Sequence, residues 1–132
     1  MFKTFLSPHN LIVSVIFFAA CSILAYAASD VGIDDNPPGI ALAYLAAVAL
    51  VLVFVHSVRT SKHFRYIMVA SAIGFVLFGI LHALVEAVGL SLGGVLFLFA
   101  VLVCPSALLV GAIGAVLMYR RERLAKEGSS AD

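Results

Sequence analysis

The sequence has few charged residues, and this shortage excludes a water-soluble fold. Only 11% of its 132 residues are Asp, Glu, Lys or Arg, and 64% are hydrophobic. Soluble domains contain about 25% charged residues. A chain with so little polar surface needs lipid as the solvent for most of its exterior. We therefore expect an integral membrane protein whose main partner is the lipid bilayer.

The sequence also lacks the motifs of known enzymes and metal sites. Its two cysteines, Cys21 and Cys104, lie in apolar stretches and form no CxxC pair. There is no phosphate-binding loop, zinc-protease motif, nucleophile elbow or pair of catalytic carboxylates. We therefore predict no catalytic residue, no metal and no cofactor. The basic run RRER follows an apolar stretch and is typical of a membrane anchor, so we expect no nucleic-acid partner.

Four apolar stretches are long enough to cross a bilayer, because about 20 helical residues span its hydrocarbon core. They cover residues 10–28, 38–58, 64–88 and 93–119. We predict an all-α, integral membrane four-helix bundle in antiparallel, up-down-up-down order. It forms a single domain over residues 1–132, with a polar tail at 120–132. Asp35 or Asn36 is expected to cap the second helix.

The first stretch has a second interpretation. Lys3 precedes it and the sequence AYAAS lies near its end, a pattern also found in cleaved signal peptides. We favour its retention as the first span.

The positions of the basic residues predict the orientation of the chain. If the N-terminus is cytoplasmic, all eight Lys and Arg residues fall on the cytoplasmic side, and Asp30, Asp34 and Asp35 fall on the other. We expect both termini in the cytoplasm and a cell membrane location, as in a prokaryotic inner membrane. Anionic lipid headgroups are the expected cytoplasmic ligands. The predicted anchors are Arg59, Lys62, Arg65, Arg120, Arg121 and Arg123.

Small residues recur at every fourth position of three helices, which allows helices to pack closely in lipid. The second-helix and third-helix stripes lie at the same expected depth in the outer half of the membrane. We predict that they touch there, or that they serve contacts between subunits. The stripes are Gly39, Ala43 and Ala47 in the second helix, Gly79, Ala83 and Ala87 in the third, and Ala107, Gly111 and Ala115 in the fourth.

Pro105 lies near the middle of the fourth span and predicts an irregularity there. Proline removes a backbone hydrogen bond and its ring clashes with the preceding turn, so we expect a kink. The kink either adjusts the shape of the helix or serves as a gating hinge.

Two ionisable residues lie within a span near its outer end, His82 and Glu86 of the third helix. They are four residues apart and share one helix face, roughly 9 Å and 3 Å from the end of the span by helical rise. Tyr44 and Tyr26 of the neighbouring helices fall at similar depths, and we group the four as a candidate outer-leaflet polar site. This site is either a structural pair that pins the helices or an outward-facing proton or cation site.

The other three histidines, His9, His56 and His63, fall on the cytoplasmic side. Basic residues surround them and disfavour a bound metal, so we interpret them as interface anchors. A haem held between His56 and His82 is excluded, because most of the membrane thickness separates them.

These features leave three functions open. The favoured one is a structural or accessory membrane subunit that forms a homo-oligomer or joins a larger membrane complex. The second is a proton- or cation-linked transporter or channel subunit that uses His82 and Glu86. The third and least favoured is a membrane enzyme acting on a lipid or quinone, because the sequence shows no nucleophile or set of metal ligands for it.

Overall fold

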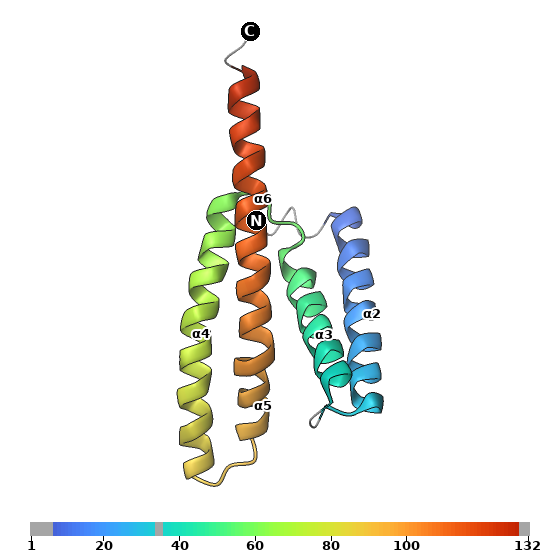
Figure 1. Ribbon diagram of the computed structural model, residues 1–132, viewed down its shortest axis with the longest axis vertical. Coiled ribbons are helices and arrows are strands. Elements are labelled where there is room, and N and C mark those ends of the chain that lie inside the picture. Colours follow the sequence, from blue (N-terminus) through green and yellow to red (C-terminus); the bar gives the residue numbers. More distant parts are fainter. Residues whose placement is uncertain (1–6, 34–35, 130–132) are drawn as a thin grey trace.

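The computed structural model describes residues 7–33 and 36–129, which fold into four long helical rods (Figure 1). Each rod is long and apolar enough to cross a membrane. The predicted all-helical class and the four apolar helices are therefore confirmed. Lys3, Asp34 and Asp35 lie outside the described residues. The elements are α2 (Pro8–Val31), α3 (Pro37–Val55), α4 (Ser61–Ala87) and a fourth rod made of α5 (Gly93–Leu98), the π-helical turn η1 (Phe99–Val103) and α6 (Cys104–Ser129).

The ends of the first two helices follow local sequence preferences. Ser7 caps α2, because its Oγ accepts a hydrogen bond from the Asn10 N–H at 3.4 Å. The helix ends at Gly32, whose φ of +85° suits a residue without a side chain. Asn36 occupies the N-cap position of α3, as predicted. Its side-chain amide, however, donates to the carbonyl of Val31 at 2.9 Å instead of capping the helix.

The helices form two antiparallel hairpins that stand side by side (Figure 1). Helix α2 packs along α3, and α4 packs along the fourth rod, whereas the smaller contact between hairpins joins α3 to that rod. Within the described chain, no Cα atom of α2 lies within 8 Å of a Cα atom of α4 or α6. The bundle is therefore open, a row in the order α2, α3, fourth rod, α4.

The predicted contact between the second-helix and third-helix stripes is wrong. The second-helix stripe is buried on α3, where Ala43 and Ala47 line a groove shared with α2 and the fourth rod. The third-helix stripe is exposed on α4, and no described Cα atom of α3 comes within 8 Å of one in α4. The fourth rod lies between the two helices, and depth in the membrane carries no information about this lateral order. The two stripes are Gly39, Ala43 and Ala47, and Gly79, Ala83 and Ala87.

The hydrophobic core joins the two hairpins near the α3–α4 connection. The ring of Phe64 on α4 packs with Val51 and Val55 of α3. Small residues of α6 make room for α4. A Cβ atom added to Gly111 would lie 2.8 Å from Cγ of Met68, and one added to Gly114 would overlap the Phe64 ring. The fourth-helix stripe therefore supports contact within the chain.

We predict that Gly114→Ala destabilises the protein by about 1–3 kcal/mol, because the added methyl must displace the buried Phe64 ring. Gly94→Ala is the matched control, since a Cβ atom there meets nothing within 4 Å. The control is expected to change stability by less than about 1 kcal/mol. Thermal unfolding in detergent measures both variants. Equal melting temperatures would contradict the described packing of Phe64.

Candidate functional site

A short connection between α4 and α5 brings the two helices together at the end of the molecule that holds His82. Helix α4 ends in a Schellman-type turn: the Gly89 N–H bonds to the Glu86 carbonyl at 3.0 Å, and the Leu90 N–H bonds to the Val85 carbonyl at 3.1 Å. Gly89 has a φ of +76°, which favours glycine. This turn directs the chain back, so that the first turn of α5 lies beside His82.

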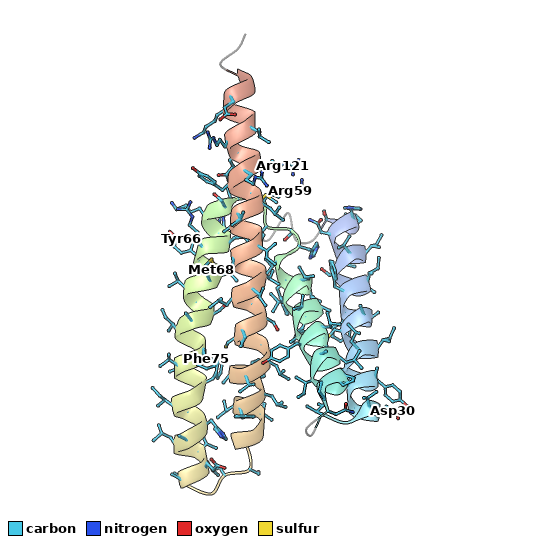
Figure 2. The ribbon with its side chains drawn as sticks, viewed as in Figure 1. Asp30, Arg59, Tyr66, Met68, Phe75 and Arg121 are labelled. Atoms are coloured by element: carbon cyan, nitrogen blue, oxygen red, sulfur yellow. The ribbon has the colours of Figure 1, made fainter. Side chains whose placement is uncertain are left out.

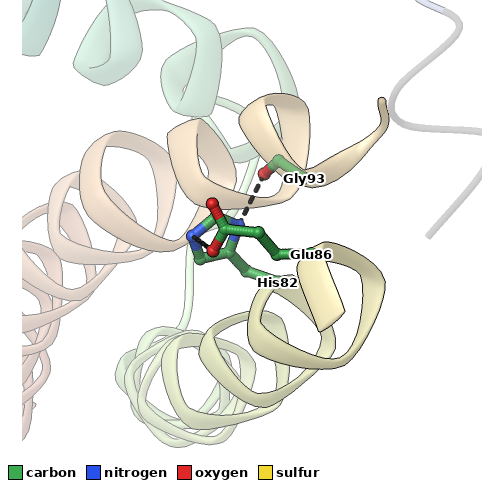
Figure 3. Close-up of polar contacts among 3 residues, drawn as sticks. All are labelled: His82, Glu86 and Gly93. Carbon is green, nitrogen blue, oxygen red and sulfur yellow. Dashed lines mark hydrogen bonds and ion pairs between the residues drawn. The ribbon is translucent and has the colours of Figure 1, made fainter. Parts of the chain in front are cut away.

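The imidazole of His82 links the two helices (Figure 3). Its Nδ1 lies 2.9 Å from the carbonyl oxygen of Gly93. Because a carbonyl oxygen only accepts hydrogen bonds, we assign the proton to Nδ1. Gly93 is buried, and a Cβ atom at this position would lie 3.3 Å from Nδ1, so glycine permits the close approach. The ring of Phe97 lies 5.3 Å from the imidazole, between ring centroids.

The carboxylate of Glu86 lies on the other side of the imidazole (Figure 3). The distance from His82 Nε2 to Glu86 Oε2 is 3.6 Å, and the Glu86 side chain is 73% exposed. The two residues border an open hollow of about 370 Å³, which we call the hairpin site. It can hold a proton or a hydrogen-bond donor between its nitrogen and its carboxylate. The hairpin site is lined by His82, Glu86, Leu90, Ser91, Gly93, Gly94 and Phe97.

The two tyrosines grouped with this site lie elsewhere. Tyr26 is 76% exposed on α2, which has no close backbone approach to α4 in the described chain. The hydroxyl of Tyr44 donates to the carbonyl of Val101 at 3.0 Å, between α3 and the fourth rod. The structure thus brings together His82 and Glu86 and adds Gly93 and Phe97. The sequence signals for these two additions are weak, because the register across the turn decides which α5 residues face His82.

The Tyr44 hydrogen bond compensates for Pro105. In a regular α-helix the Val101 carbonyl would accept the N–H of residue 105, but proline has none. The helix widens into the π-turn η1, in which the Cys104 N–H bonds to the Phe99 carbonyl. Tyr44 then supplies the missing donor to Val101. The sequence located this irregularity, but not its π-helical form or its partner on α3.

The opposite end of the molecule carries the predicted basic anchors. Arg59 and Arg121 lie at this end and Asp30 lies at the other (Figure 2). All six anchors are exposed. The Arg123 Nε donates to Glu127 at 2.8 Å. Helix α6 continues to Ser129, so the described part of the polar tail is helical and projects beyond the other helices (Figure 1).

Glu122 of this tail forms hydrogen bonds with the first residue of α4, Ser61. Its carboxylate accepts hydrogen bonds from the Ser61 N–H at 3.0 Å and from the Ser61 hydroxyl at 2.8 Å. A negative charge at a helix N-terminus is favourable, because the first N–H groups lack partners within the helix. Glu122 lies beyond the apolar part of α6. The bonds from Ser61, aided by the charges of Lys126 and Arg65, lower the pKa of its carboxyl from the usual value.

The three histidines expected on the cytoplasmic side do not converge on one point. Nδ1 of His56 lies 3.0 Å from the Leu52 carbonyl oxygen, and its Nε2 lies 3.1 Å from that of Asn10. His63 pairs with Thr60 at 2.8 Å. Within residues 7–33 and 36–129, no three potential metal ligands lie close enough to hold one ion. The roles of these histidines as interface anchors stay a prediction.

Comparisons with known protein families, with curated proteins and with solved structures found no match. The four apolar helices fit a small membrane protein. Any more specific function has to be argued from the residues and their geometry.

We predict that Tyr44→Phe destabilises the protein by about 1 kcal/mol, because it leaves the Val101 carbonyl without its donor in an apolar setting. Pro105→Ala restores an N–H at position 105. In that background Tyr44→Phe is expected to cost less, by about 0.5–1 kcal/mol. A double-mutant cycle of unfolding free energies measures the difference. An equal cost in both backgrounds would show that Tyr44 does not compensate for the proline.

Proposed function

We propose that this chain is a structural or accessory membrane subunit that associates with copies of itself or with a larger membrane complex. The observation that carries the proposal is how little of its helical surface the chain covers by itself. In the most apolar 18-residue windows of α2 and α4 only 6% of residues are buried, against 44% in α3. Two of the four helices are therefore available for lateral contacts.

The exposed third-helix stripe suits such a contact. A Cβ atom at Gly79 would meet nothing within 4 Å, and Ala83 and Ala87 are exposed beside it. Between membrane helices there is no hydrophobic driving force, so association depends on close van der Waals packing, which small residues allow. A second helix could approach the α4 backbone closely along this stripe.

The hairpin site supports a structural role more than transport. Nδ1 of His82 is used within the chain, where it joins α4 to α5. In the sequence, the four predicted spans contain no Asp, Glu, Lys, Arg or other His between this pair and the basic end, apart from residues at the span ends. The alternative, a proton- or cation-linked transporter or channel subunit, would need other subunits to complete a path.

Association through α4 can be tested with two alanine substitutions. Ala83→Leu enlarges the third-helix stripe, whereas Ala70→Leu makes the same change on the opposite face of α4, where Ala70 is also exposed. Native mass spectrometry in a mild detergent is expected to show assemblies heavier than the 13.9 kDa monomer for the natural sequence and for Ala70→Leu. Ala83→Leu should weaken them about tenfold, since overpacking costs about 1–3 kcal/mol. A natural sequence that is monomeric, with no other protein bound, would refute the proposal.

The proposed orientation places both termini in the cytoplasm, and cysteine labelling of intact cells can test it. Ser91→Cys, in the α4–α5 connection, should react with a membrane-impermeant thiol reagent, because positively charged connections stay inside and this one carries no charge. Thr60→Cys, in the basic α3–α4 connection, should react only after the cells are opened. The unaltered chain is the control for Cys21 and Cys104. The reverse labelling pattern would invert the topology.

A further inference from the structure

We propose that the hairpin site binds a primary ammonium group, carried by an ethanolamine-type lipid headgroup or by a free amine. The inference depends on the proposed position of the end of α4 at the membrane surface. It does not depend on association between subunits.

The hydrogen bonding of His82 leaves one nitrogen that faces the hollow. In its neutral form the His82 imidazole has a single N–H, and the Gly93 carbonyl at 2.9 Å accepts it from Nδ1. Nε2 then carries a lone pair and faces the Glu86 carboxylate at 3.6 Å. Two acceptors at this distance repel each other unless a donor lies between them. An ammonium group has three N–H donors and can bond to both.

In the described structure, the negative charge of the Glu86 carboxylate is also not balanced by a Lys or Arg side chain. All of the described Lys and Arg residues belong to the α3–α4 connection, the start of α4 or the polar tail of α6, at the opposite end of the molecule. None of them pairs with Glu86 in the described structure, where its carboxylate faces the imidazole of His82 at 3.6 Å. A carboxylate next to a neutral imidazole attracts a cation, and 73% exposure of the Glu86 side chain leaves it room to adjust.

Phe97 favours an ammonium group over a metal ion. Its ring lines the same hollow as His82 and Glu86. The face of an aromatic ring attracts an organic cation within about 6 Å, an interaction worth about 0.5–2 kcal/mol. One carboxylate and one imidazole are too few ligands for a closed site of a divalent metal, which takes four or more.

The surroundings of the site favour a lipid as the carrier of the ammonium group. Glu86 lies in the last turn of α4, next to the connection that we place at the membrane surface. Leu90 and Phe97 border the hollow and are 55% and 48% exposed. The acyl chains of a lipid can lie along such apolar side chains while the headgroup nitrogen enters the hollow.

The first experiment compares lipids that share a phosphate but differ in the nitrogen. The protein is incubated in detergent with equal amounts of phosphatidylethanolamine, phosphatidylcholine and phosphatidylglycerol, and retained lipids are counted by native mass spectrometry. We expect phosphatidylethanolamine to be retained about tenfold more than the other two, because only it offers N–H donors to charged acceptors. Glu86→Gln should abolish this preference. Glu127→Gln, the same change at the opposite end, should preserve it.

The second experiment uses free ethanolamine and follows the ¹⁵N signals of the histidine rings. A shift of the His82 Nε2 signal with added ethanolamine, absent in Glu86→Gln, identifies the amine itself as sufficient.

Equal retention of the ethanolamine and choline lipids by the natural sequence, together with an unshifted His82 signal, would overturn the proposal. This comparison needs no variant, so it decides the question even if Glu86→Gln fails to fold. Undiminished ethanolamine binding in a folded Glu86→Gln protein would also overturn it. A monomeric protein that retains phosphatidylethanolamine would refute subunit association and leave the ammonium site standing.

Discussion

Lipid offers no hydrogen bonds to a protein backbone, so each carbonyl inside a span needs a donor from the chain itself. Pro105 breaks this condition in the fourth rod, and the Tyr44 hydroxyl restores it at Val101. The restoring donor comes from the other hairpin. A local defect in one helix is thereby converted into a polar link between α3 and the fourth rod. This hydrogen bond adds a directional interaction to the apolar contact between the two hairpins.

The elements of the fold could be predicted because each depends on its own stretch of chain. An apolar run of sufficient length must be helical in lipid. Pro105 disturbs its helix whichever neighbours that helix packs against. The lateral order of the helices could not be predicted in this way. Gly79 and Gly39 belong to similar small-residue stripes, yet Gly79 is exposed, whereas Gly39 is buried in the first helical turn of α3, beside Gly32. A stripe of small residues indicates that close packing is possible, but it does not identify the helix that packs against it.

The candidate site likewise has a part that local sequence predicts and a part that depends on tertiary contacts. The shared face of His82 and Glu86 follows from helical geometry alone, because they are four residues apart. Gly93 and Phe97 join them only through the turn at Gly89, whose length sets the register between α4 and α5. Expected depth alone grouped Tyr44 with His82 and Glu86. Its actual hydrogen-bond partner, Val101, depends on the lateral order of the helices. Local spacing in the sequence therefore predicted part of the site. The features that depend on tertiary contacts could not be predicted from it.

The open row of helices has a consequence for symmetry. Its two edges, α2 and α4, are different surfaces. If α4 of one copy packs against α4 of another, the interface is isologous and closes as a two-fold pair. If α4 packs against α2 of the next copy, the contact is heterologous, and successive copies form a ring or an extended ribbon in the membrane. The choice of edge therefore determines whether assembly stops at two copies or continues.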